Sequence, residues 1–492
     1  MLGVAVPGAN TVCAHRALLP GRVSGVEVND RVATMTTNVP SELEGQALGL
    51  AESVVMGVAG TAPAFSIAAT TATLIGAVGP LAPASLLYCG LIMFGVTFAY
   101  LHLNRLNPSA GAAYAWVGAI FNRTLGFFAG WALLVASVVF MVSGTIPAAT
   151  ATLTLIAPRL AVQPAAVALV AAVWLLVVSA VIVKGIKLTS YSQIAMTVTE
   201  TAILLALIVL ALAKYGAHPA HVFSLVWLSP GSFTPQLFAT GALTALFFFW
   251  GWDVTVNLTE ETRDASRAPG HGALWAMLIV LALFMGFAVV ILLVLSDQEI
   301  QQSSTNVVFA IADKLLPRPW SYVAVIAVML STVGTLETSI LQFTRTLYAK
   351  GRDGILHPRY AMLHKRWRTP WVATAVITAI GLLLLFGSSY FPSVGAIIKD
   401  SVNAIGFQVA FYYGLAGFAC AWRFRREAMR SVFNLVFLLV WPLFSALFLW
   451  FIAAYSVPTF DLATNVVGLG GIALGVVPLM VNRRMAARTA AG

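Results

Sequence analysis

Long apolar stretches alternate with short polar segments along nearly the whole chain. Crossing roughly 30 Å of hydrocarbon at about 1.5 Å per residue takes about 20 residues, and the stretches have this length. They lack the apolar–polar alternation of barrel strands, and a chain in lipid must satisfy its backbone polar groups internally. The pattern therefore predicts an all-α membrane protein with about twelve spanning helices, at residues 50–78, 82–103, 125–156, 163–183, 188–213, 236–259, 272–295, 320–345, 371–388, 393–422, 432–453 and 462–481.

Composition supports a chain that lies in a lipid bilayer. Only 9% of its 492 residues are charged and 60% are apolar, against roughly 25% and 45 to 50% in soluble domains. The net charge of +10 is not gathered on one segment with interleaved aromatics, so we expect no nucleic-acid partner. Cys13, Cys89 and Cys420 offer no disulfide or metal spacing, and we expect no metal and no cofactor.

The basic residues predict the orientation of the chain. An even number of spans places both ends on one side of the membrane, and cytoplasmic loops carry an excess of Lys and Arg. Of the 28 Lys and Arg, 23 fall on the side of the amino terminus, so both termini are expected to be cytoplasmic. The five on the other side are Arg159, Lys214, Lys314, Arg318 and Lys399.

The segments outside the spans carry two further expectations. Residues 1–46 lack the order of a signal peptide and are expected to form a disordered cytoplasmic tail. Within it, Met35 opens a polar lead-in that is more typical of a translation start than Met1. On the opposite side, residues 296–319 have the pattern of an amphipathic helix lying over the outer mouth.

Two spans carry signals for a break in the helix. Residues 57–63 read GVAGTAP, where glycines weaken a helix and the proline removes a donor. Residues 249–253 read FWGWD, a glycine between tryptophans followed by a carboxylate at membrane depth. Kinks or close-packing sites would explain either motif alone. Together, in spans 1 and 6, they indicate two inverted five-helix repeats with a substrate site at the midplane, whose free helix ends suit a zwitterionic amino acid.

This interpretation divides the chain into five parts. Each repeat holds five spans, and the last two spans and a short cytoplasmic tail follow them. The predicted boundaries are 1–46 for the tail, 47–213 for repeat 1, 236–425 for repeat 2, 431–482 for the two extra spans and 483–492 for the carboxyl-terminal tail.

Three motifs resemble the amino acid-polyamine-organocation transporter superfamily. They are the span 8 and loop signature at residues 330–370, the NPSAGAAY segment at 107–114 and FFFWGWDVTVNLTEET at 247–262. The resemblance covers about residues 47–425. It implies the leucine-transporter fold, a ten-helix core with two extra helices, and secondary transport of amino acids or amines.

The resemblance also implies a set of substrate-binding residues. The backbone in span 1 would hold the carboxylate and amine of the substrate, and span 6 would face it with a tryptophan, a glycine and an acidic residue. The GVAGTAP motif departs from the commoner GxG pattern, which leaves the span 1 positions uncertain by one or two residues. The candidates are Gly57, Gly60, Thr61, Trp250, Gly251 and Asp253.

Glu200 is a second departure, because many relatives carry a lysine at this position of span 5, where its ammonium is thought to replace a sodium ion. Gln193 and Thr197 share its helical face, which must point into the bundle. We expect Glu200 to take up and release a proton, coupling substrate to protons. A permanently protonated structural glutamate and a sodium ligand are the alternatives.

Other polar residues inside the spans have open interpretations. Ser331, Thr335 and Thr338 form a stripe with Gln342 that serves either packing or an ion, with packing favoured. Asp253 could instead cap the lower half of helix 6. For Glu337, Arg345 and Lys399 are the candidate partners.

The sequence thus predicts a secondary active transporter that moves amino acids across the plasma (inner) membrane by alternating access, with a proton as the coupling ion. An amino acid/amine exchanger and a polyamine transporter are the alternatives. An embedded enzyme is disfavoured, because no HExxH or GxSxG motif occurs, and a nucleotide-driven pump lacks its GxxxxGK[ST] loop.

Overall fold

The computed structural model describes residues 42–303, 306–390 and 394–482. Met35 and the predicted tails lie outside these residues, apart from positions 42–46. Within the described chain the regular structure is helical, and strands are absent. The helices of the first half are α2 (Leu50–Gly60), α3 (Pro63–Val78), α4 (Ala82–Leu106), α5 (Ala113–Ile120), α6 (Arg123–Ile156), α7 (Pro164–Val183), α8 (Ile186–Tyr215), α9 (Pro235–Ala245) and α10 (Val254–Asn257).

The second half continues the same architecture. Two π-helical segments, Leu435–Val440 and Val466–Gly470, interrupt its last two spans. Its helices are α11 (Ala268–Val294), α12 (Asp297–Ser303), α13 (Val307–Leu315), α14 (Val323–Arg352), α15 (Trp371–Ser388), α16 (Val394–Ala428), α17 (Val432–Asn434), α18 (Trp441–Ser456), α19 (Leu462–Asn465) and α20 (Gly471–Ala473).

The described helices account for the predicted twelve crossings. Ten helical stretches are long and apolar enough to cross a membrane, and the bent pair formed by Pro235–Ala242 and Leu246–Asn257 adds one more. The stretch Leu50–Leu106 has 57 residues, too many for one crossing, and the chain turns within it at Gly79, which has φ +58°. It therefore supplies two spans, and the chain is a multi-pass membrane protein.

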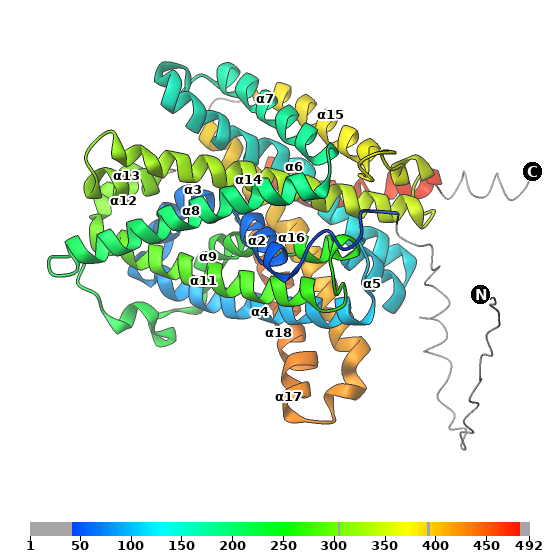
Figure 1. The fold of residues 1–492 in the computed structure, drawn as a ribbon. Helices are drawn as coiled ribbons and strands as arrows, with labels where there is room; N and C mark the ends of the chain where they lie inside the picture. The colour runs from blue at the N-terminus through cyan, green and yellow to red at the C-terminus, as the bar shows by residue number, and fades with distance from the viewer. Residues whose placement is uncertain (1–41, 304–305, 391–393, 483–492) are drawn as a thin grey trace, which may run out of the picture. The chain divides into compact units, whose positions relative to one another are not determined.

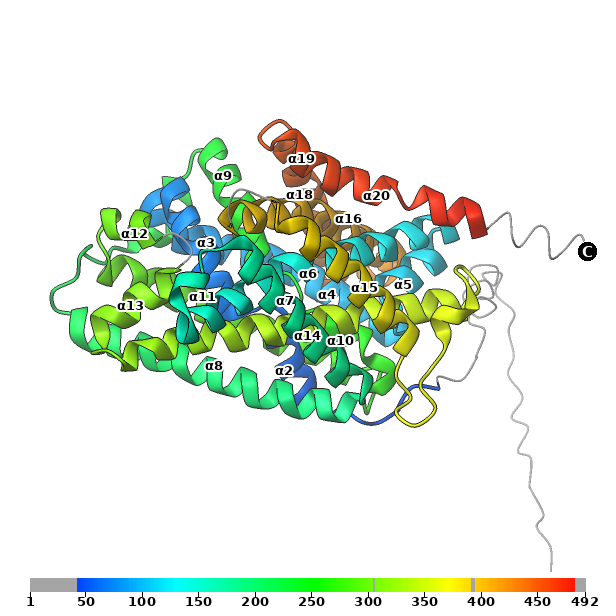
Figure 2. The same ribbon diagram turned by 90° about the horizontal axis from the view of Figure 1, so that it is seen from above.

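The long helices run roughly parallel, with different short helices at the two ends of the bundle. Figure 1 shows α12 and α13 at one end and α5 at the other, and Figure 2 shows the same separation from above. We call the end with α5 and residues 353–370 the basic end, because this loop carries Arg359, Lys365, Arg366 and Arg368. The opposite end is called the α12 end.

The helical segment predicted in residues 296–319 consists of two short helices, α12 and α13. Both pack against α3, and α13 also contacts α8. Lys314 of α13 donates a hydrogen bond to Glu299 of α12, and this contact holds the pKa of Glu299 down at about 2. The ion pair ties the two helices together over the end of the broken first span.

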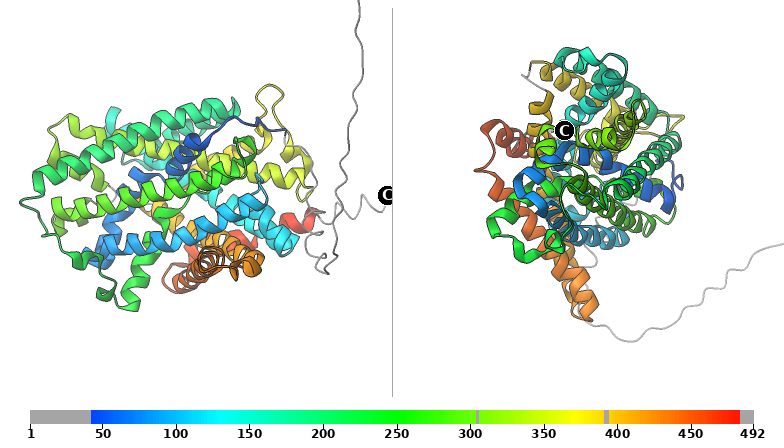
Figure 3. Two further views of the ribbon diagram at one scale, coloured as in Figure 1. Left: turned by 60° about the horizontal axis from the view of Figure 1, so that its bottom comes forward. Right: turned by 90° about the vertical axis from the view of Figure 1, so that its left-hand side faces the viewer.

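Burial separates central from peripheral helices of the bundle, which Figure 3 shows end-on in its right-hand view. In the apolar part of α16, 83% of the residues are buried inside the protein, against 33% in α7 and 28% in α8. Helix α6 packs against both α14 and α16, and α14 packs against α2 and α3, whereas α7, α8 and α15 turn much of their surface outward. The polar side chains of the candidate site belong to the central group or point toward it.

Candidate substrate site

The first break interrupts the span made by α2 and α3. Helix α2 ends at Gly60, and Ala62 takes the left-handed conformation with φ +48° just before α3 begins at Pro63. Because proline has no N–H and its ring clashes with the preceding turn, a helix can begin at Pro63 but does not run through it without distortion. The break predicted at residues 57–63 is confirmed.

The second break lies between α9 and α10. Helix α9 tightens into a 3-10 turn at Leu246–Phe249, Trp250 is extended, and the helix resumes at Val254. Gly251 has φ +105°, a conformation that residues with a side chain rarely adopt. The predicted break in span 6 is therefore also confirmed.

The two breaks touch through their glycines. A Cβ atom on Gly60 would collide with the carbonyl group of Gly251, and a Cβ on Gly251 would collide with that of Gly60. Gly57 packs instead against Ala276 of α11, with no room for a side chain. In this conformation the backbones of the two broken helices are in direct contact at the centre of the bundle.

Glu200 reaches from α8 to the first break. Its carboxylate accepts a hydrogen bond from the Ala64 N–H at 2.8 Å, and the Ser331 hydroxyl also bonds it. The next N–H of α3, that of Phe65, donates to Ser331 at 3.2 Å. As predicted, Gln193, Thr197 and Glu200 are all buried on one face of α8.

The hydroxyl stripe of α14 is divided in its contacts. Ser331 and Thr335 reach the broken span, since Ser331 accepts from Phe65 and the Thr335 hydroxyl donates to the Ala59 carbonyl at 2.5 Å. Thr338 donates only to Thr335 of its own helix, at 3.0 Å. Ser331 and Thr335 thus join α14 to both halves of span 1, in agreement with the favoured packing interpretation.

Asp253 lies between two tyrosines of α16. Its carboxylate accepts hydrogen bonds from Tyr412 at 3.1 Å and Tyr413 at 2.8 Å, and Tyr412 in turn accepts from the indole N–H of Trp250 at 2.9 Å. Asp253 stands at the start of α10, but its side chain makes no capping hydrogen bond there. The alternative that Asp253 caps this helix through its side chain is therefore wrong.

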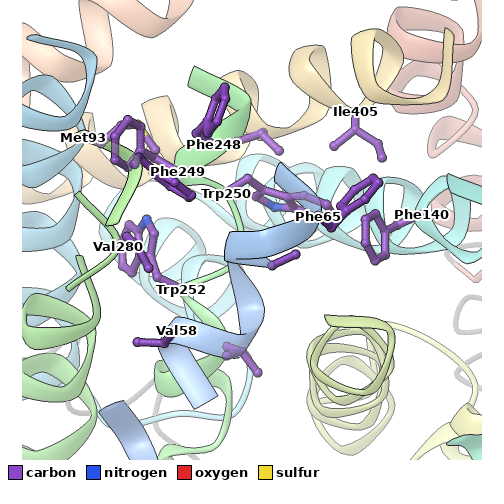
Figure 4. Close-up of a cluster of buried hydrophobic side chains, with 14 of the residues drawn as sticks. Val58, Phe65, Met93, Phe140, Phe248, Phe249, Trp250, Trp252, Val280 and Ile405 are labelled. Carbon is purple, nitrogen blue, oxygen red and sulfur yellow. The ribbon is translucent and has the colours of Figure 1, made fainter. Parts of the chain in front are cut away.

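A cavity of about 610 Å³ opens beside the second break, toward the α12 end. Trp250 belongs to its wall, and Figure 4 shows Trp250 directed toward Phe140 and Trp252 away from it. Gly57, Gly60, Thr61, Gly251, Asp253 and Glu200 are buried outside this wall. No charged side chain occurs among the described lining residues, which include Thr70, Thr73, Thr240, Thr244, Phe247, Asn403, Phe407 and Ser456.

Comparison with known proteins decides the family. The family model described as amino acid permease matches residues 46–482. The chain belongs to this family. The predicted membership of the amino acid-polyamine-organocation superfamily is confirmed, and with it the leucine-transporter fold of about twelve helices.

Individual relatives of the permease differ in what they carry. An uncharacterized transporter of Mycobacterium tuberculosis is 27% identical over 77% of this chain and 80% of its own length. The low-affinity putrescine importer PlaP of Escherichia coli is 25% identical over 62% of this chain and 66% of its own. The serine/threonine exchanger SteT of Bacillus subtilis is 22% identical over 66% of this chain and 70% of its own.

Ion pairs join the elements at the basic end of the permease. Arg345 of α14 binds both carboxylate oxygens of Glu261, at 2.8 and 2.9 Å, with both side chains buried. About two turns further along α14, Arg352 binds Glu260 at 2.9 Å. The backbone N–H groups of Ala47 and Leu48 donate to the Glu261 carbonyl, which fastens the segment before α2 to the segment after α10.

This arrangement corrects the expectation for Glu337. The predicted partner Arg345 is taken by Glu261, and the side chain of Lys399 lies outside the described residues. Glu337 accepts its hydrogen bonds from Ser192 of α8, at 3.0 and 3.2 Å. The Ser192 hydroxyl lies on another helix, 145 residues away along the chain, whereas Arg345 lies about two turns along the same helix.

Sequence reasoning missed the tyrosine pair of α16. Tyr412 and Tyr413 are fully buried and carry the contacts of Asp253, yet hydropathy treats them as ordinary residues of span 10. Buried phenol groups need hydrogen-bond partners, and a carboxylate in another span needs donors. Two adjacent tyrosines in an apolar span are the signal that could have linked span 10 to Asp253.

Proposed function

We propose that the permease is a secondary active transporter of amino acids or related amines, driven by protons and working by alternating access. The observation that carries the proposal is the contact of two unwound helices beside a cavity of about 610 Å³ that includes Trp250. Breaks at mid-membrane leave helix ends whose dipoles bind small charged solutes, and they give the helices points at which to bend.

The predicted residues have separate roles in this proposal. Trp250 closes the cavity over the substrate, and Gly251 lets the chain turn beneath it. The α2 backbone at Gly57, Gly60 and Thr61 meets the substrate when the two breaks separate. Asp253 supplies negative charge behind Trp250 through Tyr412.

Glu200 is proposed as the proton carrier. Its carboxylate holds the Ala64 N–H at the start of α3, and a charged acceptor makes a stronger hydrogen bond than a neutral one. Protonation would weaken this contact and loosen the half-helix, which links the proton to the movement of the break. Ser331, Thr335 and Thr338 would keep α14 in register with span 1 during this movement.

The permease is proposed to lie in the plasma (inner) membrane with both termini in the cytoplasm. The support is the excess of Lys and Arg on one side of the map. The basic end would then be cytoplasmic and closed by its ion pairs, and the cavity would open outward.

Uptake into proteoliposomes tests the proposal. Purified permease should accumulate a labelled substrate from a panel of amino acids and amines when the outside is acidified, and a protonophore should abolish the accumulation. Glu200→Gln should lose accumulation driven by the pH gradient but retain counterflow into preloaded vesicles. Glu337→Gln is the matched control, because this buried carboxylate contacts Ser192 and not the break, and it should keep the pH response.

Exchange is the alternative, and the name of the relative SteT gives it support. Uptake that needs preloaded substrate and ignores imposed gradients would favour the exchanger. Accumulation driven by sodium alone, or an undiminished pH response in Glu200→Gln, would remove Glu200 as the proton carrier.

A further inference from the structure

The start of α3 is the place where a broken helix offers N–H groups to an anion. Every backbone N–H group from Thr61 to Ser66 donates a hydrogen bond to an acceptor within the protein. Pro63 has no N–H, and the N–H of Ala64 goes to Glu200. The remaining donations are Thr61 to the Val58 carbonyl at 3.1 Å, Ala62 to the Ala59 carbonyl at 3.1 Å, Phe65 to the Ser331 hydroxyl at 3.2 Å and Ser66 to the Ala62 carbonyl at 2.8 Å.

Glu200 therefore supplies a carboxylate where the carboxylate of an amino acid would otherwise be expected. It comes from α8, 136 residues along the chain from its partner, and only 1% of its surface is exposed. A carboxylate in such a setting is stabilised by the N–H and by the positive end of the helix dipole. A second carboxylate brought to the same N–H would be repelled by the first.

The charges around the core give an independent argument. Asp253 and Glu200 are buried, and within the described chain their hydrogen-bond donors are hydroxyl, amide and backbone N–H groups. Among the described side chains, the two basic ones that are fully buried lie toward the basic end, where Arg345 binds Glu261 and Lys350 donates to the Phe127 carbonyl at 2.7 Å. In the part of the core that the structure describes, Glu200 and Asp253 thus have no basic partner.

The lining of the cavity also favours a substrate with a positive charge. No Arg, Lys or His occurs among its described lining residues, so the described part of the wall offers no cationic side chain to a substrate carboxylate. It does offer hydroxyl oxygens and the rings of Trp250 and Phe247, which can face an ammonium group. Behind Trp250, the Tyr412 hydroxyl connects the indole to Asp253.

We propose that Glu200 takes the place of a substrate carboxylate, so that the permease recognises its substrate through an ammonium group and carries amines that lack an α-carboxylate. This inference rests on the proposed transport function and narrows its substrate class. The ammonium would lie against Trp250, and the carbonyl end of α2 at Gly57, Gly60 and Thr61 would receive it when the breaks separate.

Matched ligand pairs test the proposal on the intact wild-type permease. The amines putrescine, cadaverine and phenethylamine differ from ornithine, lysine and phenylalanine only by the carboxylate. In thermal-shift titrations of the detergent-purified protein, a ligand that binds the folded state raises the melting temperature. At least one amine should bind about tenfold or more tightly than its amino acid, because the carboxylate would be buried without a donor. Tighter binding of the amino acids, or binding of none of the amines, would overturn the proposal.

Glu200→Ala gives a second readout. Removing the side chain exposes the Ala64 N–H, so acetate should raise the melting temperature of this variant, and the preference for the amine over its amino acid should shrink. Glu337→Ala also removes a buried carboxylate, but away from the break, and should leave the preference and the acetate response as in the wild type. Unchanged selectivity in a folded Glu200→Ala protein contradicts the proposal, and the wild-type ligand pairs decide the matter if this variant does not fold.

The outcome is separable from that of the proposed function. A permease that accumulates amino acids in preference to amines remains a transporter, and only the substrate class is wrong. A protein that binds amines but accumulates none of the panel under any gradient or in counterflow is not the proposed transporter, although its ligand preference stands.

Discussion

The two breaks at the centre of the permease differ in how they are stabilised. At the first, the half-helix α3 begins at a proline, and another helix supplies an acceptor, Glu200, for its N–H groups. At the second, Gly251 makes the turn, and the acidic residue Asp253 belongs to the broken span itself and receives the hydroxyls of Tyr412 and Tyr413.

This difference assigns different chemistry to the two sides of the site. The first break uses its N–H groups within the protein, and the carbonyls of Val58, Ala59 and Thr61 accept hydrogen bonds there as well. Under the proposal, the end of α2 offers its carbonyls to the substrate once the breaks separate. The second break keeps its carboxylate beneath phenol groups and an indole that reaches the cavity wall. Under the proposal, both sides favour a positively charged group, although by separate means. Substitutions at each break can measure the contribution of each set of contacts to stability and binding.

The largest effect is expected where the breaks touch. Gly251→Ala introduces a side chain at φ +105° and drives its Cβ into the Gly60 carbonyl. Backbone strain of this kind costs about 1 to 3 kcal/mol, and the collision adds to it. We expect loss of most folded protein in detergent, measured by size-exclusion chromatography. Gly387→Ala, at a helical position with open space around it, is the control and should behave as the wild type.

Loss of the hydrogen-bond acceptor at the first break should have the second-largest effect on stability. Glu200→Ala leaves the buried Ala64 N–H without its partner, which costs about 1 to 3 kcal/mol. A lower melting temperature in anion-free buffer is the expected result. An unchanged melting temperature would mean that α3 does not depend on Glu200 for its start.

Loss of one donor at the second break should be smaller. Tyr413→Phe removes one of the two phenol groups on Asp253, and hydrogen bonds to charged groups contribute about 1.5 to 3 kcal/mol in soluble proteins and less between membrane helices. The melting temperature should fall by less than in Glu200→Ala. Tyr413→Phe should also weaken amine binding less than Asp253→Asn does, because the carboxylate and its charge remain. If Tyr413→Phe and Asp253→Asn weaken amine binding equally, the Tyr413 hydroxyl is needed for binding as much as the charge of Asp253.

The sequence predicted the breaks well because their causes are local. Pro63 ends a helix wherever it stands, and Gly251 permits a conformation that its neighbours do not. The buried face of α8 followed from its polar side chains, since a carboxylate in hydrocarbon must point inward. Span boundaries were right to within several residues because the thickness of the bilayer sets the length of each helix.

The partners of the buried side chains could not be predicted in the same way. Glu200 and Ala64 are 136 residues apart, and Asp253 and Tyr413 are 160 apart, so their meeting depends on how the helices pack. The failure of Arg345 as a candidate partner of Glu337 has the same origin: Arg345 lies two turns along the same helix, yet its guanidinium turns toward Glu261 on another segment. Helix periodicity indicates which face is buried but not which neighbour it meets.

The smallest expected effect tests how α14 is fastened to the first break. Thr335→Val removes the hydroxyl that donates to the Ala59 carbonyl, and hydrogen bonds between membrane helices contribute about 0.6 kcal/mol on average. Thr338→Val is the matched control, since its hydroxyl bonds only its own helix and its loss should change stability still less. Melting temperatures of the two variants side by side measure the difference. If Thr338→Val proves the more damaging, the contact with Ala59 does not stabilise the first break, and the contacts of α3 with Glu200 and Ser331 are the side-chain hydrogen bonds that do.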